Sequence, residues 1–256
     1  MPAATPSLEL RGLGVAYGSV RAVRDLSVGV AAGEVLGVIG SNGAGKTSIV
    51  NAVIGAVPLA SGTLSFEGKD LTSSSIAARV RAGIAVSPEG RGILPGLTVQ
   101  ENLLLGAYSV RRSIKSELSA RLDQAFEFFP VLKERRMQMA QTLSGGEAAM
   151  LSIGRALMSG PRLLLLDEPT LGLAPIMRAR LFERIAVLKE TGLAMIIVEQ
   201  RAAELLDVSD RLLQLQRGEA VGIVEAGDVD VEALAQLYFG GGATPGSEKK
   251  TEPKGL

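Results

Sequence analysis

The stretch that most constrains this chain is Gly40–Thr47, which reads GSNGAGKT. It fits the pattern G-x-x-x-x-G-K-[ST], in which glycines let successive backbone N–H groups turn toward a phosphate without a Cβ in the way. Lys46 adds a positive charge for the β- and γ-phosphates, and Thr47 offers a hydroxyl to Mg²⁺. The apolar run Val35–Ile39 predicts a buried strand before this loop, and Thr47–Val57 a helix after it. We therefore predict a nucleotide site formed by Gly40, Ser41, Asn42, Gly43, Ala44, Gly45, Lys46, Thr47 and Ser48.

Composition excludes several other kinds of site. Lys plus Arg and Asp plus Glu balance at 27 each, whereas a protein that coats nucleic acid has a basic excess. The chain has no cysteine and no histidine, which excludes disulfides, thiolate zinc sites, a cysteine nucleophile and a histidine base. We expect neither a secretory leader nor a membrane span, since the longest apolar runs have strand length. The positive mean hydropathy fits a sheet buried on both faces, an apolar docking surface, or both.

A second candidate site follows the apolar run Leu163–Leu166, which ends in Asp167 and Glu168. Acids at the carboxyl end of a buried parallel strand lie where open α/β sheets bind ligands. Asp167 is a candidate to hold Mg²⁺ through water, and Glu168 to polarise the attacking water. Two solvated turn acids would be the alternative, but they fit poorly directly behind an apolar strand. Another apolar run, Leu193–Val198, ends in Glu199 and Gln200.

Two further features remain open when the residues are read alone. Tyr17 could stack on a base through its ring, although a half-buried core tyrosine is favoured. Ser144, Gly145, Gly146 and Glu147 open a predicted helix that runs to about Ser159, and its exposed N–H groups could bind a second anion or simply form an N-cap.

The expected organisation is one large α/β domain with a helical insert. We expect a loose start over 1–7, a folded domain over 8–240 with a helical subdomain at about 97–160, and a disordered tail over 241–256. Met137 and Met139 are expected to fill the core of the insert. A capping box is predicted at Thr98 and Glu101. The other expected elements are edge strands at Leu8–Val15 and Leu26–Val30, strands at Ile84–Ser87, Leu212–Gln216 and Val221–Val224, and helices at Ile76–Ala82, Leu118–Phe129 (ended by Pro130), Ala179–Glu190 and Val231–Tyr238.

Together these motifs resemble the ABC ATPase family over about residues 8–240. LSGGE, between the phosphate loop and LLLLDEP, is highly specific to that family. Finer segments are similar to the ATP-binding subunits of branched-chain amino acid importers: SPEGRGILPGLTVQENLLLGAY, FEFFPVLKER, LSIGRALMSGP, DEPTLGLAP, VEQ and LYFGG. The resemblance implies a P-loop ABC ATPase fold with a mainly parallel core sheet, an antiparallel β edge subdomain and a helical subdomain.

The resemblance also assigns roles to individual residues. It implies that Tyr17 stacks on adenine and that Ser144, Gly145, Gly146 and Glu147 meet the ATP held by a second subunit. Asp167 and Glu168 keep the metal and water roles. Glu89 stands where most members have a glutamine that senses Mg²⁺, and Gln200 where most have a switch histidine. Both departures look characteristic of the importer subgroup. Ala148 and Ala149 replace the usual glutamine after LSGGE, which puts some dimer affinity in doubt.

The implied function is ATP hydrolysis, with Mg²⁺, that powers an importer of branched-chain or other hydrophobic amino acids. The implied partners are a second ABC ATPase subunit (a copy or a paralogue), transmembrane permease subunits and, indirectly, a periplasmic substrate-binding protein, with no nucleic acid. The implied location is peripheral, at the cytoplasmic face of the inner membrane. Importers of urea or short amides, and a soluble ABC ATPase without a transport role, are the alternatives.

Overall fold

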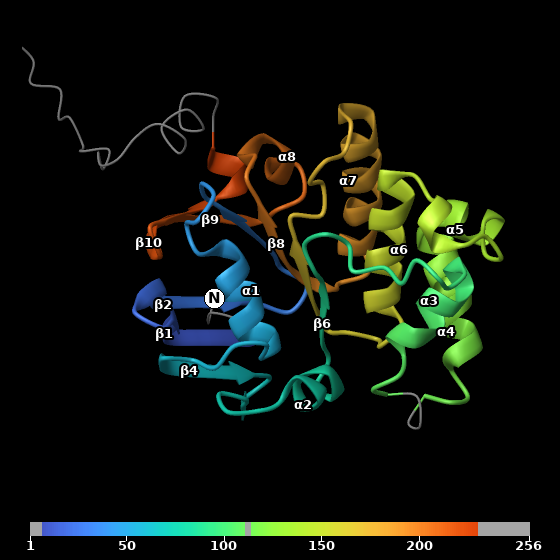
Figure 1. The fold of residues 1–256 in the computed structure, drawn as a ribbon. Helices are drawn as coiled ribbons and strands as arrows, with labels where there is room; N and C mark the ends of the chain where they lie inside the picture. Colours follow the sequence, from blue (N-terminus) through green and yellow to red (C-terminus); the bar gives the residue numbers. More distant parts are fainter. Residues whose placement is uncertain (1–6, 111–113, 230–256) are drawn as a thin grey trace, which may run out of the picture.

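A computed structural model describes residues 7–110 and 114–229, which fold into two sheets covered by helices (Figure 1). The expected helix Val231–Tyr238, the expected tail and all but the last residue of the expected loose start lie outside the described residues. In the described part of the chain, no helix has both the length and the apolar content needed to cross a bilayer.

The central sheet has six strands in the order β10-β9-β3-β8-β7-β6. Its strands from β9 to β6 run parallel to their neighbours, and β10 pairs antiparallel with β9. Ile39 lies in register with Glu199, and Asp167 with Val198, so β3, β7 and β8 end at the same edge. All six expected strands are confirmed: β3 Val35–Ile39, β6 Ile84–Ser87, β7 Leu163–Asp167, β8 Ala194–Glu199, β9 Arg211–Gln216 and β10 Glu219–Glu225.

The second sheet is antiparallel, in the order β2-β1-β4-β5. The expected edge strands are confirmed, and both are longer than expected because they form one hairpin that turns between Tyr17 and Val20. The strands are β1 Leu8–Tyr17, β2 Val20–Val30, β4 Ser61–Phe66 and β5 Lys69–Asp70.

The helices follow the predicted order with local differences. α7 begins at Pro175, before the expected Ala179, and Pro130 begins α5 as well as ending the preceding helix, because the fixed φ of proline suits a first helical turn. The capping box of Thr98 and Glu101 is confirmed. The helices are α1 Lys46–Ile54, α2 Ile76–Arg81, α3 Val99–Gly106, α4 Leu118–Phe128, α5 Pro130–Glu134, α6 Gly145–Leu157, α7 Pro175–Lys189 and α8 Ala202–Leu206, with 3-10 turns η1 Ala140–Thr142 and η2 Ala226–Asp228. The sequence did not predict α8.

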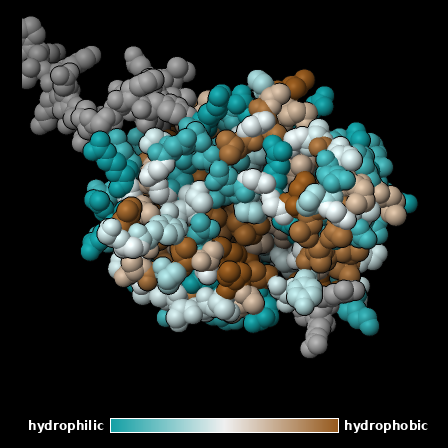
Figure 2. All heavy atoms as spheres, in the orientation of Figure 1, coloured by the Kyte–Doolittle hydropathy of each residue, from teal (hydrophilic) through white to brown (hydrophobic). Residues whose placement is uncertain are grey.

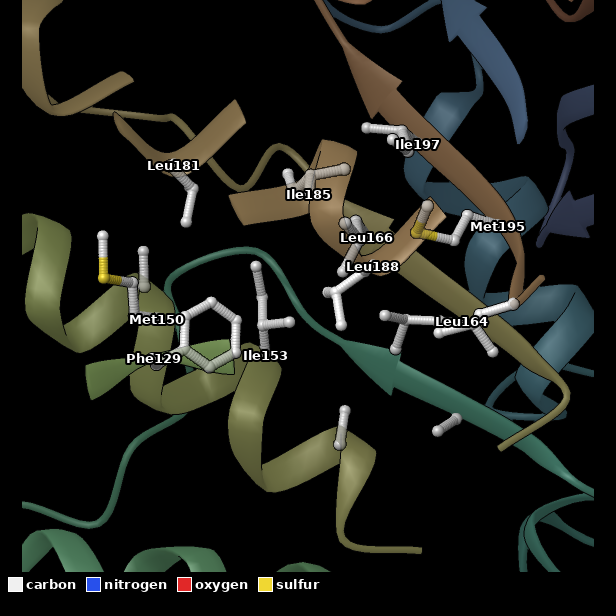
Figure 3. Packing of buried hydrophobic residues seen from close by; sticks show 14 of the residues in the cluster. Phe129, Met150, Ile153, Leu164, Leu166, Leu181, Ile185, Leu188, Met195 and Ile197 are labelled. Carbon is white, nitrogen blue, oxygen red and sulfur yellow. The ribbon is translucent and has the colours of Figure 1, made fainter. Parts of the chain in front are cut away.

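The core lies on both faces of the central sheet. On one face, alternate residues of β7 and β8 pack against α6 and α7, as Leu164, Leu166, Ile153 and Ile185 show (Figure 3). The other face packs against α1 and the antiparallel sheet. A sheet buried on both sides accounts for the apolar composition of its strands. Figure 1 shows α3, α4 and α5 grouped on the opposite side of the molecule from β1, β2 and β4.

The expectation that Met137 and Met139 fill the core is wrong. Met137 is 71% exposed and Met139 is also exposed, because both lie in the turn that follows α5. The turn is held instead by backbone bonds, in which Val99 and Gln100 donate to the carbonyls of Gln138 and Arg136.

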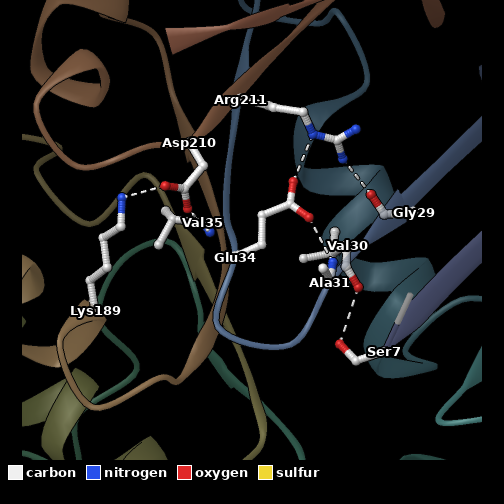
Figure 4. Close-up of polar contacts among 9 residues, drawn as sticks. All are labelled: Ser7, Gly29, Val30, Ala31, Glu34, Val35, Lys189, Asp210 and Arg211. Carbon is white, nitrogen blue, oxygen red and sulfur yellow. Dashed lines mark hydrogen bonds and ion pairs between the residues drawn. The ribbon is translucent and has the colours of Figure 1, made fainter. Parts of the chain in front are cut away.

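Charged side chains tie the elements together at the amino ends of the parallel strands (Figure 4). Arg211 at the start of β9 pairs with Glu34 at 2.7 Å, and Lys189 at the end of α7 pairs with Asp210 at 2.7 Å. The other carboxylate oxygen of Asp210 accepts the backbone N–H of Val35 at 2.8 Å. This network fixes one end of the sheet and leaves the carboxyl ends of the strands for a ligand.

Candidate active site

The phosphate loop joins β3 to α1. Gly43 and Gly45 have φ values of +80° and +108°, which L side chains rarely adopt, and a Cβ on Gly45 would lie 2.3 Å from the carbonyl oxygen of Ala22. Backbone conformation thus favours glycine at both positions, and at Gly45 a side chain would also clash with the neighbouring backbone. Lys46 is buried, and its Nζ donates to the carbonyls of Gly40 at 3.0 Å and Ser41 at 3.3 Å.

The acids predicted at the end of β7 meet the loop directly. Thr47 Oγ1 donates to Asp167 Oδ1 at 3.2 Å, and Lys46 Nζ lies 3.2 Å from Glu168 Oε1. Gln200, just after β8, donates from Nε2 to Glu168 Oε2 at 2.8 Å. Three segments that are far apart in sequence therefore converge at the carboxyl edge of the sheet, where ligands bind in open α/β folds.

Burial raises the pKa of Asp167 to about 6. The hydrogen bond from Thr47 opposes this rise, the negative charges of Glu89 and Glu168 add to it, and the positive charge of Lys46 opposes it again. A carboxylate that is costly to keep charged in a buried position is one that a cation would stabilise.

A cavity of about 520 Å³ opens in front of these residues. Tyr17 is 46% exposed on its wall, so the interpretation of Tyr17 as a core residue is wrong. Glu89 is also exposed there, in the loop after β6. The cavity is lined by Tyr17, Ala22, Asn42, Gly43, Gly45, Lys46, Thr47, Ser48, Glu89, Glu168, Leu171 and Gln200.

The residues of LSGGE lie elsewhere, since none of them lines this cavity. Ser144 caps α6: its Oγ accepts from the N–H of Glu147 at 3.4 Å, and Glu147 Oε2 accepts from the N–H of Ser144 at 2.8 Å. Arg135 pairs with Glu147 at 2.8 Å. Glu147 therefore has partners within its own chain, a capping role that the spacing S-x-x-E could have indicated. Ala148 and Ala149 are buried in α6.

Thr170 and Glu199 have no role predicted from the sequence, although Thr170 follows the predicted acids and Glu199 precedes Gln200. Glu199 Oε1 accepts from both the N–H and the hydroxyl of Thr170. Burial raises the pKa of Glu199, and these hydrogen bonds oppose the rise. Nothing in the sequence marks this contact, because it joins two segments 29 residues apart.

The donors present fit Mg²⁺ better than a transition metal. Among the described residues, no group of three or more His, Cys, Asp or Glu side chains could hold a metal ion. The Thr47 hydroxyl bonds to the Asp167 carboxylate, and Glu89 lines the same cavity as Thr47. Mg²⁺ commonly takes one or two carboxylates and completes its shell with phosphate and water, so the sparse oxygen set suits it.

Comparisons with known proteins also relate this chain to ATP-binding proteins. Residues 23–171 match the family described as ABC transporter. The high-affinity branched-chain amino acid transport ATP-binding protein BraG of Pseudomonas aeruginosa is 45% identical over 205 residues, which cover 80% of this chain and 87% of BraG. The lipopolysaccharide export system ATP-binding protein LptB of Escherichia coli is 33% identical, with 84% of this chain and 89% of LptB covered. A solved nucleotide-free ATP-binding cassette from an ABC transporter has a TM-score of 0.77 and 27% identity, and the match covers 93% of this chain and 100% of that chain.

Proposed function

This chain belongs to the ABC transporter family and is an ABC-type ATPase, and from that premise we propose that it powers an importer of branched-chain or other hydrophobic amino acids. The observation that carries the proposal is the 45% identity to BraG over most of both chains. Importers of urea or short amides and a soluble ATPase without a transport role are not favoured, because two relatives that the chain covers by more than four-fifths, BraG at 45% identity and LivF of Archaeoglobus fulgidus at 33%, are both described as branched-chain amino acid transport ATP-binding proteins.

The proposed chemistry uses the convergence of the phosphate loop with β7 and β8. Lys46 and the loop N–H groups bind the phosphates, and the ring of Tyr17 stacks on adenine. Glu168 orients and polarises the attacking water, and Gln200 holds the Glu168 carboxylate and donates to the γ-phosphate. Mg²⁺, held by Thr47, Asp167 and Glu89, would neutralise charge on the phosphate oxygens. Positioning and electrostatics thus supply most of the catalysis.

A second subunit is proposed to complete the site. Ser144 is exposed at the N-terminus of α6 and lies outside the cavity of its own chain. The γ-phosphate of a partner's ATP would meet Ser144, Gly145 and Gly146, where helix N–H groups favour an anion. The partner is a copy of this chain or a related subunit.

The proposed contact with the permease is the apolar surface of α3 and the turns beside it. Leu94, Leu105 and Tyr108 are exposed there, and Tyr108 is 75% exposed. A pocket lined by Leu97, Glu101, Leu104, Leu105, Tyr108 and Leu118 lies on the same surface. Figure 2 shows apolar side chains gathered where α3 and α4 lie. Such a patch is typical of an interaction site, and we place the chain peripherally at the cytoplasmic face of the membrane. A periplasmic binding protein would deliver the substrate.

Uptake of radiolabelled leucine by proteoliposomes tests the proposal, with this chain reconstituted beside the permease subunits encoded next to it. Uptake is expected with ATP and wild-type protein, and not with Glu168→Gln. Tyr108→Asp is expected to abolish stimulation of the ATPase by the permease and to leave basal hydrolysis unchanged. Val187→Asp, an equally polar change at an exposed residue of α7, is the matched control. ATP hydrolysis without uptake of any amino acid would contradict the importer assignment.

A further inference from the structure

Thr170 and Glu199 are buried residues that have no part in the proposed chemistry. Each lies close in sequence to a residue that does: Thr170 to Glu168, and Glu199 to Gln200. Thr170 follows Glu168 by two positions, and Glu199 immediately precedes Gln200. Glu199 is 4% exposed and Thr170 5%. Glu199 Oε1 accepts the Thr170 N–H at 3.0 Å and the Thr170 hydroxyl at 2.7 Å. One carboxylate oxygen thus holds two donors of a single residue.

These bonds fasten two segments that also meet through their catalytic side chains. The Glu168 N–H donates to the carbonyl of Val198 at 2.9 Å, and the Gln200 amide donates to the Glu168 carboxylate at 2.8 Å. Glu168 and Thr170 therefore both bond to the end of β8. The pair Thr170–Glu199 lies on the far side of Glu168 from β7, so it fixes the turn after the strand.

The turn needs such a fastening because Glu168 has a φ of +45°, in the left-handed region that glycine favours. A non-glycine residue pays a free-energy cost there and stays only where its surroundings hold it. The β7 strand holds Glu168 from one side, and Thr170 holds it from the other. Without the Thr170 contact, Glu168 would keep its backbone bonds to Val198 and Leu171, but the turn after it would be less restrained, which would let its carboxylate shift away from Lys46.

The contact between Thr170 and Glu199 is also linked to helices α7 and α8. Glu204 of α8 has Oε2 at 3.4 Å from the Thr170 hydroxyl and pairs through Oε1 with Arg178 of α7 at 3.1 Å. The single hydroxyl proton goes to Glu199, which is closer. Burying a charged carboxylate costs free energy, so Glu199 destabilises the fold unless its hydrogen bonds compensate for that cost.

We propose that Glu199 is a positioning residue for ATP hydrolysis: through Thr170 it fixes the turn that holds the Glu168 carboxylate between Lys46 and Gln200. The inference rests on the proposed role of Glu168 and extends it. Glu199 acts on the geometry of the water-orienting carboxylate and has no contact with nucleotide. Loss of Glu199 should therefore lower kcat and leave the KM for ATP nearly unchanged.

Three variants of the full chain test this positioning role. Glu199→Ala removes the acceptor, and Thr170→Val removes only the hydroxyl, so each should lower kcat by about ten- to a hundredfold with KM changed by less than about twofold. Glu199→Gln keeps an acceptor oxygen of the same reach and should retain most of the wild-type kcat. Thr72→Val is the matched control, since the Thr72 hydroxyl also makes hydrogen bonds, here with the backbone of Leu64, but lies in the antiparallel sheet region away from the site. It should reduce the melting temperature without reducing kcat.

Hydrogen exchange of peptides covering 168–173 gives a readout independent of turnover. Exchange should accelerate in Glu199→Ala and Thr170→Val and stay at the wild-type rate in Glu199→Gln. If Glu199→Ala does not fold, Thr170→Val decides the outcome. Active wild-type protein with unchanged kcat in Thr170→Val, or a raised KM with unchanged kcat, would overturn the inference and leave the proposed function intact. Inactive wild-type protein would count against the proposed function, and unchanged exchange in the folded variants would then overturn the positioning role separately.

Discussion

The amide of Gln200 donates to Glu168 Oε2 at 2.8 Å, so the residues that immediately follow two neighbouring strands, β8 and β7, are joined at the site by their side chains. The neutral amide can orient the carboxylate and donate a hydrogen bond, but it cannot exchange a proton near neutral pH. This chain, which has no histidine, therefore has a hydrogen-bond donor at position 200 that does not titrate, whereas a histidine there would titrate.

Replacing Gln200 should slow hydrolysis. Gln200→Ala removes the hydrogen bond to Glu168 and the proposed bond to the γ-phosphate, a loss of about 1–3 kcal/mol if these groups are buried. Steady-state kinetics should show the change in kcat. Gln200→His should remain active and add a limb to the pH profile of kcat near 6.5 as a rough guide. An unchanged rate in Gln200→Ala would exclude this residue from the site.

Binding and turnover should separate between Lys46 and Glu168. Lys46→Ala should abolish tight MgATP binding, because the phosphate charge loses its buried partner. Glu168→Gln should retain binding and stop turnover. Equilibrium binding of a fluorescent ATP analogue, measured beside phosphate release, distinguishes the two. Near wild-type hydrolysis by Glu168→Gln would show that another group orients the water.

The raised pKa of Asp167 predicts a pH dependence of stability when nucleotide and metal are removed. The folded chain binds a proton at Asp167 up to about pH 6, whereas the unfolded chain releases it near its ordinary value of 3.8. The free energy of unfolding therefore falls as pH rises through this window and stays lower above it. Asp167→Asn should remove that loss, and so be more stable than wild type by on the order of 1–3 kcal/mol at pH 7.5.

Urea unfolding in EDTA from pH 4 to pH 8 measures this difference. Asp123→Asn, at an exposed residue of α4, is the control for the loss of a negative charge. Parallel curves for wild type and Asp167→Asn across the whole range would contradict the shift.

The composite site predicts complementation between two inactive variants. Lys46→Ala disables its phosphate loop and keeps Ser144, whereas Ser144→Arg keeps the loop and blocks α6 with bulk and charge. Each homodimer should be nearly inactive. A mixture contains heterodimers with one intact site, so ATPase activity should partly return.

ATP-dependent dimerisation should be followed in parallel by light scattering, because turnover could require both sites at once. If neither activity nor dimerisation recovers in the mixture while wild type shows both, the head-to-tail homodimer is the wrong model. A heterodimer with a related subunit would then be the assembly to test.

The carboxyl edge of the sheet could be predicted because its signals are local. Val35–Ile39 and Leu163–Leu166 are short apolar runs that lead directly into a phosphate loop and a pair of acids, and parallel pairing brings such strand ends together. The structure shows the meeting of Lys46 with Glu168 that this arrangement requires.

The features that could not be predicted depend on tertiary contacts. Met137 is apolar but lies in a turn closed by backbone hydrogen bonds, so its apolar side chain does not predict that it is exposed. α8 has five residues, too few for a helical period to show in the sequence. The bond between Thr170 and Glu199 joins the turn after β7 to the end of β8, and the two residues belong to no sequence motif that predicts it.

The contacts of Lys46 bear on what nucleotide affinity measures. Its ammonium group has three protons, and three oxygens surround it: two carbonyls of its own loop and the Glu168 carboxylate. A phosphate oxygen that accepts a hydrogen bond from Lys46 must displace one of these oxygens. Nucleotide binding therefore exchanges one acceptor of the ammonium group for another. Where the displaced oxygen belongs to Glu168, the measured affinity is a difference between two ion pairs. Displacement of Glu168 by the triphosphate would also release the Glu168 carboxylate, which would then accept a hydrogen bond from the attacking water.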